Sequence, residues 1–388
     1  QLYFIGWRKK RENDTLKTER FFVGLGRISH KILFRNQSYQ YLDGDPISGF
    51  YPYTLLDSVN TQDSIHVNSI ENTVEWSNSK FRNDIFNQPL LLRLALKHRY
   101  SKIFGYSTDT SFISLIPEMN LSARIIKEIK VAADGFYILH GYNKNDFSAS
   151  GSLVNTIKTD SVNNRFYGIK ADYLRQSPHF FDQVYSSNHF SWNYSYEPAL
   201  TQCGSLFYND KTLYTYLSYY NIKNYIYYDN YARPKQYCHY FEILQFGFNK
   251  DFKWKNWEID NKIVYQKIFD ADVLRLPDLM TNHAFYFSHP FFKKALTAQF
   301  GMEVTFFGSY YPNAYMPATR EFYLQNDFKS DNYPFFDFFV NLKIKRARIY
   351  LKFDHVNSGL MGYNYYMIPH YPMSDRAFKF GISWKFYD

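Results

Sequence analysis

The C-terminal stretch from Arg376 to Asp388 alternates between apolar residues and polar or small ones. Its even positions carry the apolar set Phe378, Phe380, Ile382, Trp384 and Phe386. A period of two places successive side chains on opposite faces of an extended backbone, so this stretch is predicted to be a β-strand. Its length matches the ~9 to 11 residues with which a tilted strand crosses a bilayer.

The same pattern recurs in two adjoining segments upstream. In 335–345 the apolar residues stand on even positions, and in 346–354 they stand on odd ones. Because almost no residues separate the two segments, they predict a hairpin whose turn lies near Lys345 and Arg346. One face of this hairpin is apolar and the other is rich in cations. In a soluble sandwich half-buried strands also alternate, so the repetition of the pattern carries the argument.

Alternating or apolar segments continue through the whole chain, and the clearest of the others is 296–307. The predicted strands are 20–36, 65–78, 90–106, 112–121, 129–140, 147–158, 165–174, 188–196, 201–208, 212–227, 240–253, 257–269, 281–288, 296–307, 335–345, 346–354 and 376–388. The apolar parity of 20–36 shifts, which predicts a bulge near Gly26. No helical periodicity competes, so the fold class is all-β: a transmembrane antiparallel up-and-down β-barrel of about 16 to 18 strands.

The strand count carries an internal conflict. Segments 37–64, 308–332 and 358–374 are predicted to be long loops, which in outer-membrane barrels gather at one end. Counting strands back from the C-terminus, however, puts the loop 37–64 at the end of the barrel that carries the short turns. Bacterial single-chain barrels are normally even-numbered, whereas the segments number seventeen, or eighteen with 2–8. One segment is therefore miscounted, and we place the error between Arg165 and Tyr227.

The composition supports a single-domain barrel with a water-filled lumen. Aromatic residues make up 21% of the chain, with 38 Tyr and 38 Phe, although the mean hydropathy is only −0.46. Many rings in a hydrophilic chain suit aromatic girdles around a wet interior. No apolar run approaches the ~18 residues of a transmembrane helix. No linker divides the 388 residues, so 1–388 is predicted to form a single domain.

The charge and the cysteine content limit the classes of function that remain possible. The net charge is +9, but the basic residues alternate along strands instead of clustering, which argues against nucleic-acid binding. Cys203 and Cys238 lie far apart, without metal-ligand spacing, and are expected to be free thiols or to form at most one bridge. The chain opens without a long apolar stretch, so an export signal is expected to have been removed or truncated away.

Catalytic constellations do not emerge from the sequence, and we expect neither an enzyme nor a cofactor. His179, Asp182 and His189 come closest to a metal cluster, but zinc needs a fuller set of ligands and structural histidines are the simpler interpretation. Glu258 and Asp260 share a strand face, as a glycosidase pair would, yet lumen charges explain them more simply.

Several motifs resemble the putative-porin family of outer-membrane β-barrels in Bacteroidota. They are YPMSDRAFKFGISWKFYD at 371–388, SNHFSWN at 187–193, GYNKNDF at 141–147 and LRLP at 274–277. The resemblance runs over most of the chain and implies a multi-pass barrel in the outer membrane of a Gram-negative cell. It also implies contact with outer-membrane lipid and lipopolysaccharide, and assembly by the barrel-insertion machinery. Family members are often longer at the N-terminus, so an N-terminal part of the family is expected to be missing and the barrel need not close. The last residue, Asp388, departs from the usual aromatic ending.

Two functions are compatible with these observations. The first is a passive channel for small hydrophilic solutes, anionic ones among them, because a wall of Lys and Arg selects for anions. The second is a non-conducting barrel that serves as a subunit of a larger outer-membrane assembly or secretion complex with other outer-membrane proteins. A soluble all-β binding protein ranks third. The residues predicted to line the lumen are Lys343, Lys345, Arg346, Arg348, Lys352, Lys379, Lys385, Glu303, Arg93, Lys97 and Arg99. Glu303 and Asp354 are the carboxylates expected to pair with this wall.

Overall fold

The computed structural model describes residues 2–11, 19–45, 47, 49–51, 53–78, 90–105, 108–158, 164–360, 362 and 365–386, with side chains from Gly26 onward. Within these residues the long strands are β1 (Leu2–Arg11), β2 (Glu19–Asp43), β3 (Thr61–Ser77), β4 (Leu90–Gly105), β5 (Asp109–Arg124), β6 (Ile129–Tyr137), β7 (Phe147–Lys158), β8 (Asn164–Gln176), β11 (Ala199–Asn209), β12 (Leu213–Tyr228), β13 (Pro234–Trp254), β14 (Trp257–Phe269), β15 (Leu279–Phe291), β16 (Leu296–Phe307), β19 (Pro334–Ile344), β20 (Ala347–Asp354) and β23 (Ala377–Trp384). The short elements are α1 (Phe180–Gln183), β9 (Val184–Ser186), β10 (Ser191–Asn193), β17 (Ala314–Met316), β18 (Glu321–Tyr323), β21 (Tyr366–Ile368) and β22 (Tyr371–Pro372).

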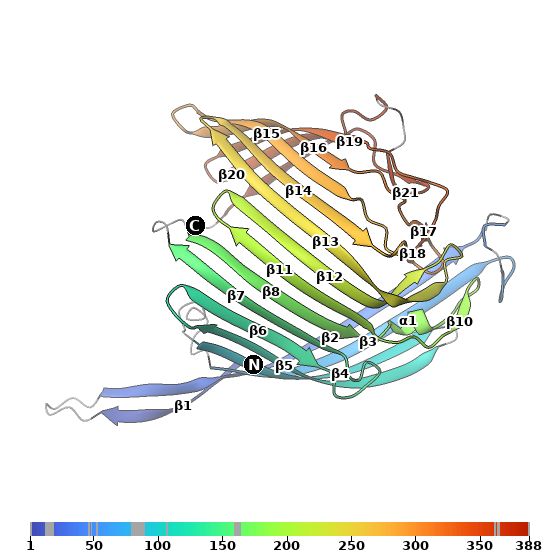
Figure 1. Ribbon diagram of the computed structural model, residues 1–388, viewed down its shortest axis with the longest axis horizontal. Coiled ribbons are helices and arrows are strands. Elements are labelled where there is room, and N and C mark those ends of the chain that lie inside the picture. The colour runs from blue at the N-terminus through green and yellow to red at the C-terminus, as the bar shows by residue number, and fades with distance from the viewer. Residues whose placement is uncertain are drawn as a thin grey trace.

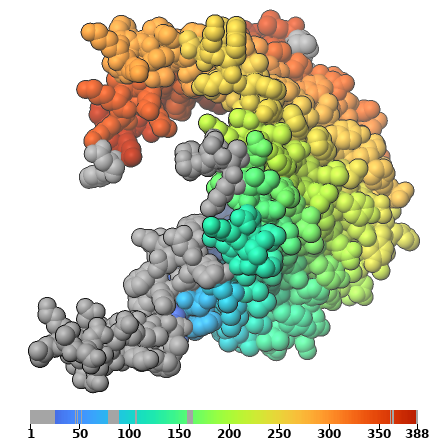
Figure 2. Space-filling model, turned by 60° about the vertical axis from the view of Figure 1, so that its left-hand side comes forward, coloured from blue at the N-terminus to red at the C-terminus, as the bar shows by residue number. Residues whose placement is uncertain are grey.

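The long strands form one antiparallel meander in which each strand pairs with the next long strand of the chain. Within the described residues the meander has seventeen strands, and its edges are β1 and β23. Figure 1 shows the strands tilted and side by side, and Figure 2 shows the sheet curled into an arc. This confirms the predicted all-β architecture and the predicted strand number.

Strand alternation sorts the side chains between a convex and a concave face. On β2 the side chains of Ile32 and Phe34 are 65% and 62% exposed, and on β23 those of Phe380 and Ile382 are 69% and 67% exposed. Paired charges gather on the opposite face, where they bridge neighbouring strands. A sheet with one mostly apolar face and one face that carries these ion pairs matches a lipid-facing barrel wall.

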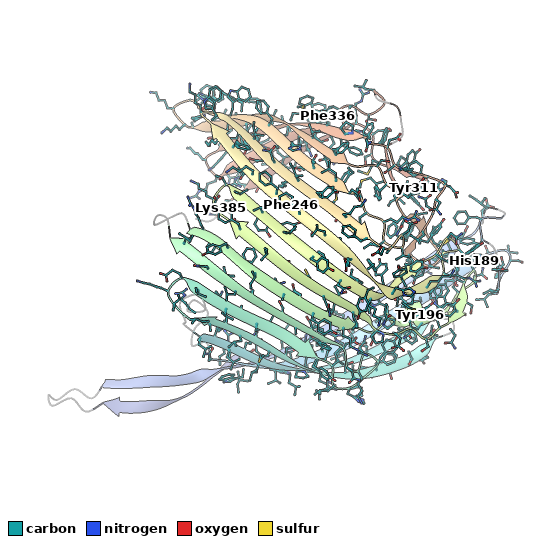
Figure 3. All side chains as sticks on the ribbon, in the orientation of Figure 1. His189, Tyr196, Phe246, Tyr311, Phe336 and Lys385 are labelled. Carbon is teal, nitrogen blue, oxygen red and sulfur yellow. The ribbon has the colours of Figure 1, made fainter. Side chains whose placement is uncertain are left out.

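The two ends of the meander differ in their connections. Tight turns such as 210–212, 255–256 and 345–346 lie at the left-hand end in Figure 1, beside the C-terminus. Long connections, including 44–60, 177–198 and 308–333, lie at the other end. Lys385 marks the tight-turn end in Figure 3, whereas His189, Tyr196 and Tyr311 mark the long-loop end. The turn predicted near Lys345 and Arg346 is confirmed.

The predicted strand 188–196 is wrong, and this error explains why the count put 37–64 at the wrong end. Only Ser191–Asn193 is extended there, and it pairs with β9 in a separate two-stranded sheet inside the loop that joins β8 to β11. Its alternation arises because Phe190 and Trp192 are buried in a loop cluster while Ser191 and Asn193 are exposed. Removing this segment brings 44–60 to the same end as the other long loops.

Other boundaries also need correction. The first long loop is 44–60 instead of 37–64, because β2 continues to Asp43 and pairs residue by residue with β3. The loops predicted at 308–332 and 358–374 contain the short hairpins β17–β18 and β21–β22. Residue 106 and residues 387 and 388, which end two predicted strands, lie outside the described residues.

The predicted bulge on β2 is confirmed. Ile5 pairs with Gly26 and Gly6 pairs with Gly24, so one extra residue of β2 stands between them. Gly26 has a φ of +134°, in the region that favours glycine, and its position against the backbone of Ser77 leaves no room for a Cβ. Within the described residues, no helix is long and apolar enough to span a membrane.

Candidate functional site

The concave face between β14 and β20 carries a hollow of about 420 Å³. It is lined by Asp260, Lys262, Asn282, Ala284, Tyr286, Gln299, Glu303, Phe339, Asn341, Tyr350, Leu351 and Lys352. The strands place these residues by register, since Glu303 lies opposite both Ala284 and Asp337. Residues directly opposite each other share a face of the sheet, so five strands contribute side chains to one polar surface.

Lys352 is the centre of an ion-pair network on this wall. Its Nζ lies 2.9 Å from Asp337 Oδ2, 3.1 Å from Asp354 Oδ1 and 3.6 Å from Glu303 Oε2. Asp354 also pairs with Lys379 of β23. The sequence indicated Glu303 and Asp354 as partners but missed Asp337, which neighbours Lys352 only through the β19–β20 register. The middle of the predicted cationic wall is therefore compensated by carboxylates.

A second charge ladder crosses β3, β4 and β5. Lys97 Nζ lies 2.6 Å from Glu118 Oε1, and Arg99 Nη2 lies 2.8 Å from Glu71 Oε2. Arg93 and Arg27 approach Glu75 at 3.7 and 3.9 Å. The structure thus brings the predicted Arg93, Lys97 and Arg99 onto one face, and each of them has an acidic neighbour.

The remaining predicted cations gather at the tight-turn end. Lys343 and Arg348 are directly opposite each other on β19 and β20, and both are exposed. Lys345 and Arg346 form the turn between these strands, and Lys385 follows the end of β23. Within the described part of the chain, Lys343, Lys345, Arg348 and Lys385 have no carboxylate within ion-pair distance. Every described tight turn contains Lys or Arg: 125–128, 210–212, 255–256, 292–295 and 345–346.

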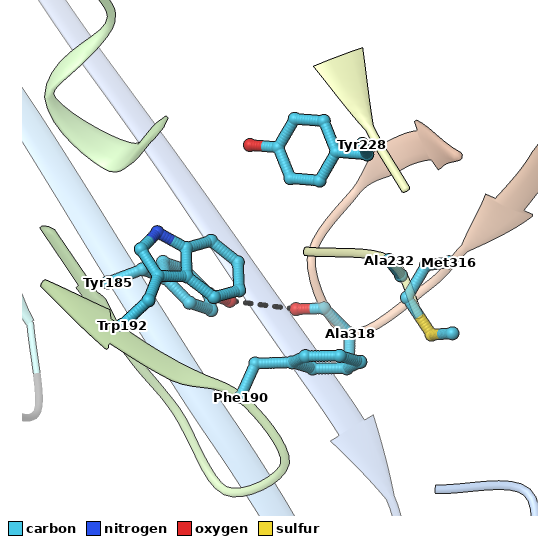
Figure 4. Close-up of a cluster of buried hydrophobic side chains, with 7 residues drawn as sticks. All are labelled: Tyr185, Phe190, Trp192, Tyr228, Ala232, Met316 and Ala318. Atoms are coloured by element: carbon cyan, nitrogen blue, oxygen red, sulfur yellow. Dashed lines mark hydrogen bonds between the residues drawn. The ribbon is translucent and has the colours of Figure 1, made fainter. Parts of the chain in front are cut away.

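The long-loop end of the arc is covered by loops that pack on one another. Tyr185, Phe190 and Trp192 of loop 177–198 form a buried cluster with residues of the β12–β13 connection and of loop 308–333 (Figure 4). Tyr185 donates a hydrogen bond of 2.8 Å to the carbonyl of Ala318, and Tyr39 of β2 donates one of 2.7 Å to the carbonyl of Pro317. Because loop 308–333 starts at β16 yet reaches β2, it crosses the opening between distant parts of the sheet.

Asn188 and His189 join loop 177–198 to loop 44–60. The Asn188 side chain accepts hydrogen bonds from the amides of Leu56 and Asp57 and donates to the carbonyl of Asp57 and to Thr61 Oγ1, all at 2.8 to 2.9 Å. His189 Nδ1 lies 3.0 Å from the carbonyl of Tyr53, so Nδ1 carries the proton and Nε2 accepts from the Thr61 hydroxyl at 2.8 Å. This anchor was not predicted from the sequence, although the residues SNH in the motif at 187–193 were the signal that could have indicated it.

A larger cavity of about 820 Å³ lies between these loops and the walls of β11 and β12. Asp182 of α1 and Glu321 of β18 face it, together with rings such as Tyr185, Trp192 and Tyr228. The Tyr228 hydroxyl donates a hydrogen bond of 2.9 Å to Asp182. Burial, reinforced by the negative charge of Asp182 and opposed by Arg320, raises the pKa of Glu321 to about 7.

The other candidate groups of the sequence occupy structural positions. Asp182 accepts a hydrogen bond from the backbone amide of His179, while His189 uses both ring nitrogens within the loop anchor. Within the described residues, no group of three or more His, Cys, Asp or Glu side chains could hold a metal ion. Tyr286 donates its hydroxyl toward both Asp260, at 3.1 Å, and Glu258, at 3.2 Å. Cys203 and Cys238 are free.

Solved structures with the same architecture include two receptors and a transporter. The ferric enterobactin receptor of Pseudomonas aeruginosa has a TM-score of 0.59 at 11% identity, and the match covers 90% of this chain and 55% of the receptor. The siderophore receptor PirA of Acinetobacter baumannii has a TM-score of 0.61 at 10% identity, with 93% and 60% covered. The copper transporter OprC has a TM-score of 0.62 at 10% identity, with 92% and 61% covered. At this identity the likeness establishes the fold, and the chain spans little more than half the length of these proteins.

The fold, with its apolar convex face and polar concave face, defines an integral β-barrel protein of the outer membrane. Residues 1–388 match the family described as "Putative porin", and the chain therefore belongs to that family. No curated protein matches the chain. Family and fold together support a barrel of the outer-membrane transport class.

Proposed function

We propose that the protein is a porin that gives small hydrophilic solutes a passive route across the outer membrane. The observation that carries this proposal is the concave wall of β14 to β20, where amides, a phenol and paired charges surround a hollow of about 420 Å³. A wall of hydrogen-bonding groups replaces part of the hydration shell of a passing solute, whereas the convex face offers mainly apolar contact to lipid.

The proposal includes a modest preference for anions, and its source is the tight-turn end. Among the described residues, Lys343, Arg348 and Lys385 have no carboxylate within ion-pair distance there, whereas Lys352 and Lys379 in mid-wall are paired. Short turns face the periplasm in outer-membrane barrels, so the free cations mark the periplasmic mouth. Charges at a wide mouth attract anions only within about a Debye length, so the preference should fade as salt rises.

Zero-current potentials across a salt gradient test the channel in planar bilayers. We expect an anion-selective sign in low salt that shifts toward zero as salt is raised. Lys343→Gln should reduce the selectivity, and the matched control is Lys223→Gln, which removes an equal charge from the convex face. A cation-selective sign, or equal effects of the two substitutions, would rule out the cationic mouth.

A non-conducting subunit of a larger assembly is the second candidate, and the covered long-loop end favours it. Loop 308–333 reaches from β16 to Tyr39 of β2 and packs against loop 177–198. Absence of conductance in bilayers that contain folded protein would favour this function over the porin. Steps of unit conductance would favour the porin and would show that the loops leave a path for ions.

A further inference from the structure

Aromatic rings on the concave wall lie across glycines of the neighbouring strand. A Cβ added to Gly301 would collide with the ring of Phe339 and with the Cβ of Tyr286, and one added to Gly381 would collide with the ring of Tyr350. Gly301 stands directly opposite both Tyr286 and Phe339, and Gly381 stands opposite Tyr350. Each ring therefore extends along the wall instead of into the lumen, and one of its faces is left toward the solute.

Planar polar groups alternate with these rings. Asn282 Nδ2 donates to Glu303 at 2.8 Å, and Asn341 Nδ2 lies 3.4 Å from Gln299 Oε1. The ionisable groups that line the hollow are two carboxylates, Asp260 and Glu303, and two ammonium groups, Lys262 and Lys352. Their formal charges cancel. The lining residues thus offer many donors and acceptors and carry no net formal charge.

We propose that this hollow is a binding subsite for a neutral polyhydroxylated solute, namely a sugar unit. Carboxylate and amide oxygens accept from hydroxyl groups, and amide and ammonium N–H groups donate to them. The apolar C–H face of a pyranose ring matches the Phe339 and Tyr350 rings that lie across Gly301 and Gly381. The volume of about 420 Å³ lies within the ~300 to 1,000 Å³ typical of small-molecule sites.

Charged solutes fit this hollow less well. Three carboxylates surround the ammonium group of Lys352, so an anion would have to displace them. Asp260 accepts from Tyr286, and Glu303 is held by Asn282 and Lys352, so a cation would compete with these contacts. A neutral solute can add hydrogen bonds to the free lone pairs without breaking any ion pair. As the solute class of the channel, this inference rests on the proposed function.

Binding of maltotriose to the purified protein in detergent tests the subsite without requiring conductance. We expect saturation transfer to the sugar in the NMR spectrum, and a dissociation constant roughly twofold to tenfold weaker for Phe339→Leu. Tyr216→Leu is the matched control, because Tyr216 lies across Gly247 in the same way but outside the hollow. Asn341→Ala, which leaves the ring over Gly301 intact, serves if Phe339→Leu does not fold.

The outcomes separate this inference from the proposed function. No saturation transfer from the wild-type protein, equal weakening in the variants and the control, or equal competition by polyethylene glycol of the same mass would overturn the subsite. Stronger binding of sodium phosphate than of maltotriose would overturn its neutral character. Sugar binding without conductance would overturn the porin and leave the subsite, whereas conductance without sugar binding would do the reverse.

Discussion

Asn188 is buried and uses its backbone as well as its side chain to join two loops. Besides the four side-chain hydrogen bonds, its amide donates to Asp63 at 2.9 Å and its carbonyl accepts from Leu55 at 2.8 Å. A single residue thus accepts hydrogen bonds from three amides of loop 44–60, those of Leu55, Leu56 and Asp57. The role of this side chain could not be predicted from the sequence, because its hydrogen-bond partners lie far away in the chain.

Asn188→Ala should loosen the loops at the long-loop end. Buried groups left without a partner cost about 1–3 kcal/mol each, so the loops should open well before the sheet unfolds. Hydrogen exchange measured over 44–60 and 177–198 should speed up, while the strands keep their protection. Asn193→Ala, an exposed position of the same loop, is the control, and equal exchange in the two variants would contradict the anchor.

Glu321 should make the stability of the loop cluster depend on pH. Its pKa is raised to about 7 in the folded protein from an ordinary value of 4.5, so the folded state binds more protons between these values. Stability therefore falls as pH rises from about 5 to 7, most steeply midway between the two pKa values, and levels off above the folded-state value. Hydrogen exchange over 308–333 should accelerate across this range.

The control for this dependence is Glu321→Gln, which keeps the shape and removes the titration. Its exchange rate, corrected for the intrinsic pH effect on amides, should be nearly flat between pH 5 and 8. A wild-type profile that is equally flat would show that Asp182 and the burial of Glu321 do not couple to loop opening.

At the scale of an element, β19 shows how alternate residues meet different solvents. Val340 lies among Phe300, Phe338 and Leu351 on the convex face, whereas its neighbour Asn341 lines the concave hollow. Val340→Arg should destabilise the barrel by roughly 2–4 kcal/mol if the residue lies near the bilayer midplane, since arginine is costly in lipid.

Asn341→Arg is the matched comparison, because it places the same side chain at the same depth on the other face. We expect it to fold nearly as well as the wild type. Urea titrations of the two variants in lipid vesicles measure the difference. Equal folding free energies would show that the two faces of β19 are assigned wrongly.

Several strand boundaries were predictable because one face of the strand meets lipid and the other meets polar groups. The predicted segments 147–158, 257–269 and 296–307 coincide with β7, β14 and β16. The period of two gives a wrong prediction at 188–196. Alternation indicates only that one side of a segment is buried, and a segment of a packed loop can be buried on one side as readily as a membrane-spanning strand. The alternation of residues also predicted that the cations share one face. The contact between Asp337 and Lys352, however, depends on how β19 pairs with β20, and this register cannot be derived from the sequence.

At the scale of the whole molecule, the seventeen long strands of the described residues share one continuous ladder of backbone hydrogen bonds. In lipid no water competes for these groups, so the sheet cannot lose one strand without burying unpaired amides and carbonyls. We expect the folded protein to resist dodecyl sulfate in the cold and to change its gel mobility after boiling. Identical mobility before and after heating, in protein extracted from the outer membrane, would contradict a cooperative barrel.

The rings that lie across Gly247, Gly301 and Gly381 tie residues on different strands into pairs. None of these glycines has a positive φ, so the neighbouring ring, and not the local backbone, forbids a larger residue. Each glycine can therefore accept a side chain only if its partner ring, such as that of Tyr216 or Tyr350, moves away or becomes smaller. In related sequences, a larger residue at the glycine should then occur together with a smaller residue in place of the ring. A single change to alanine at either the glycine or the ring position should be rarer than such a double change.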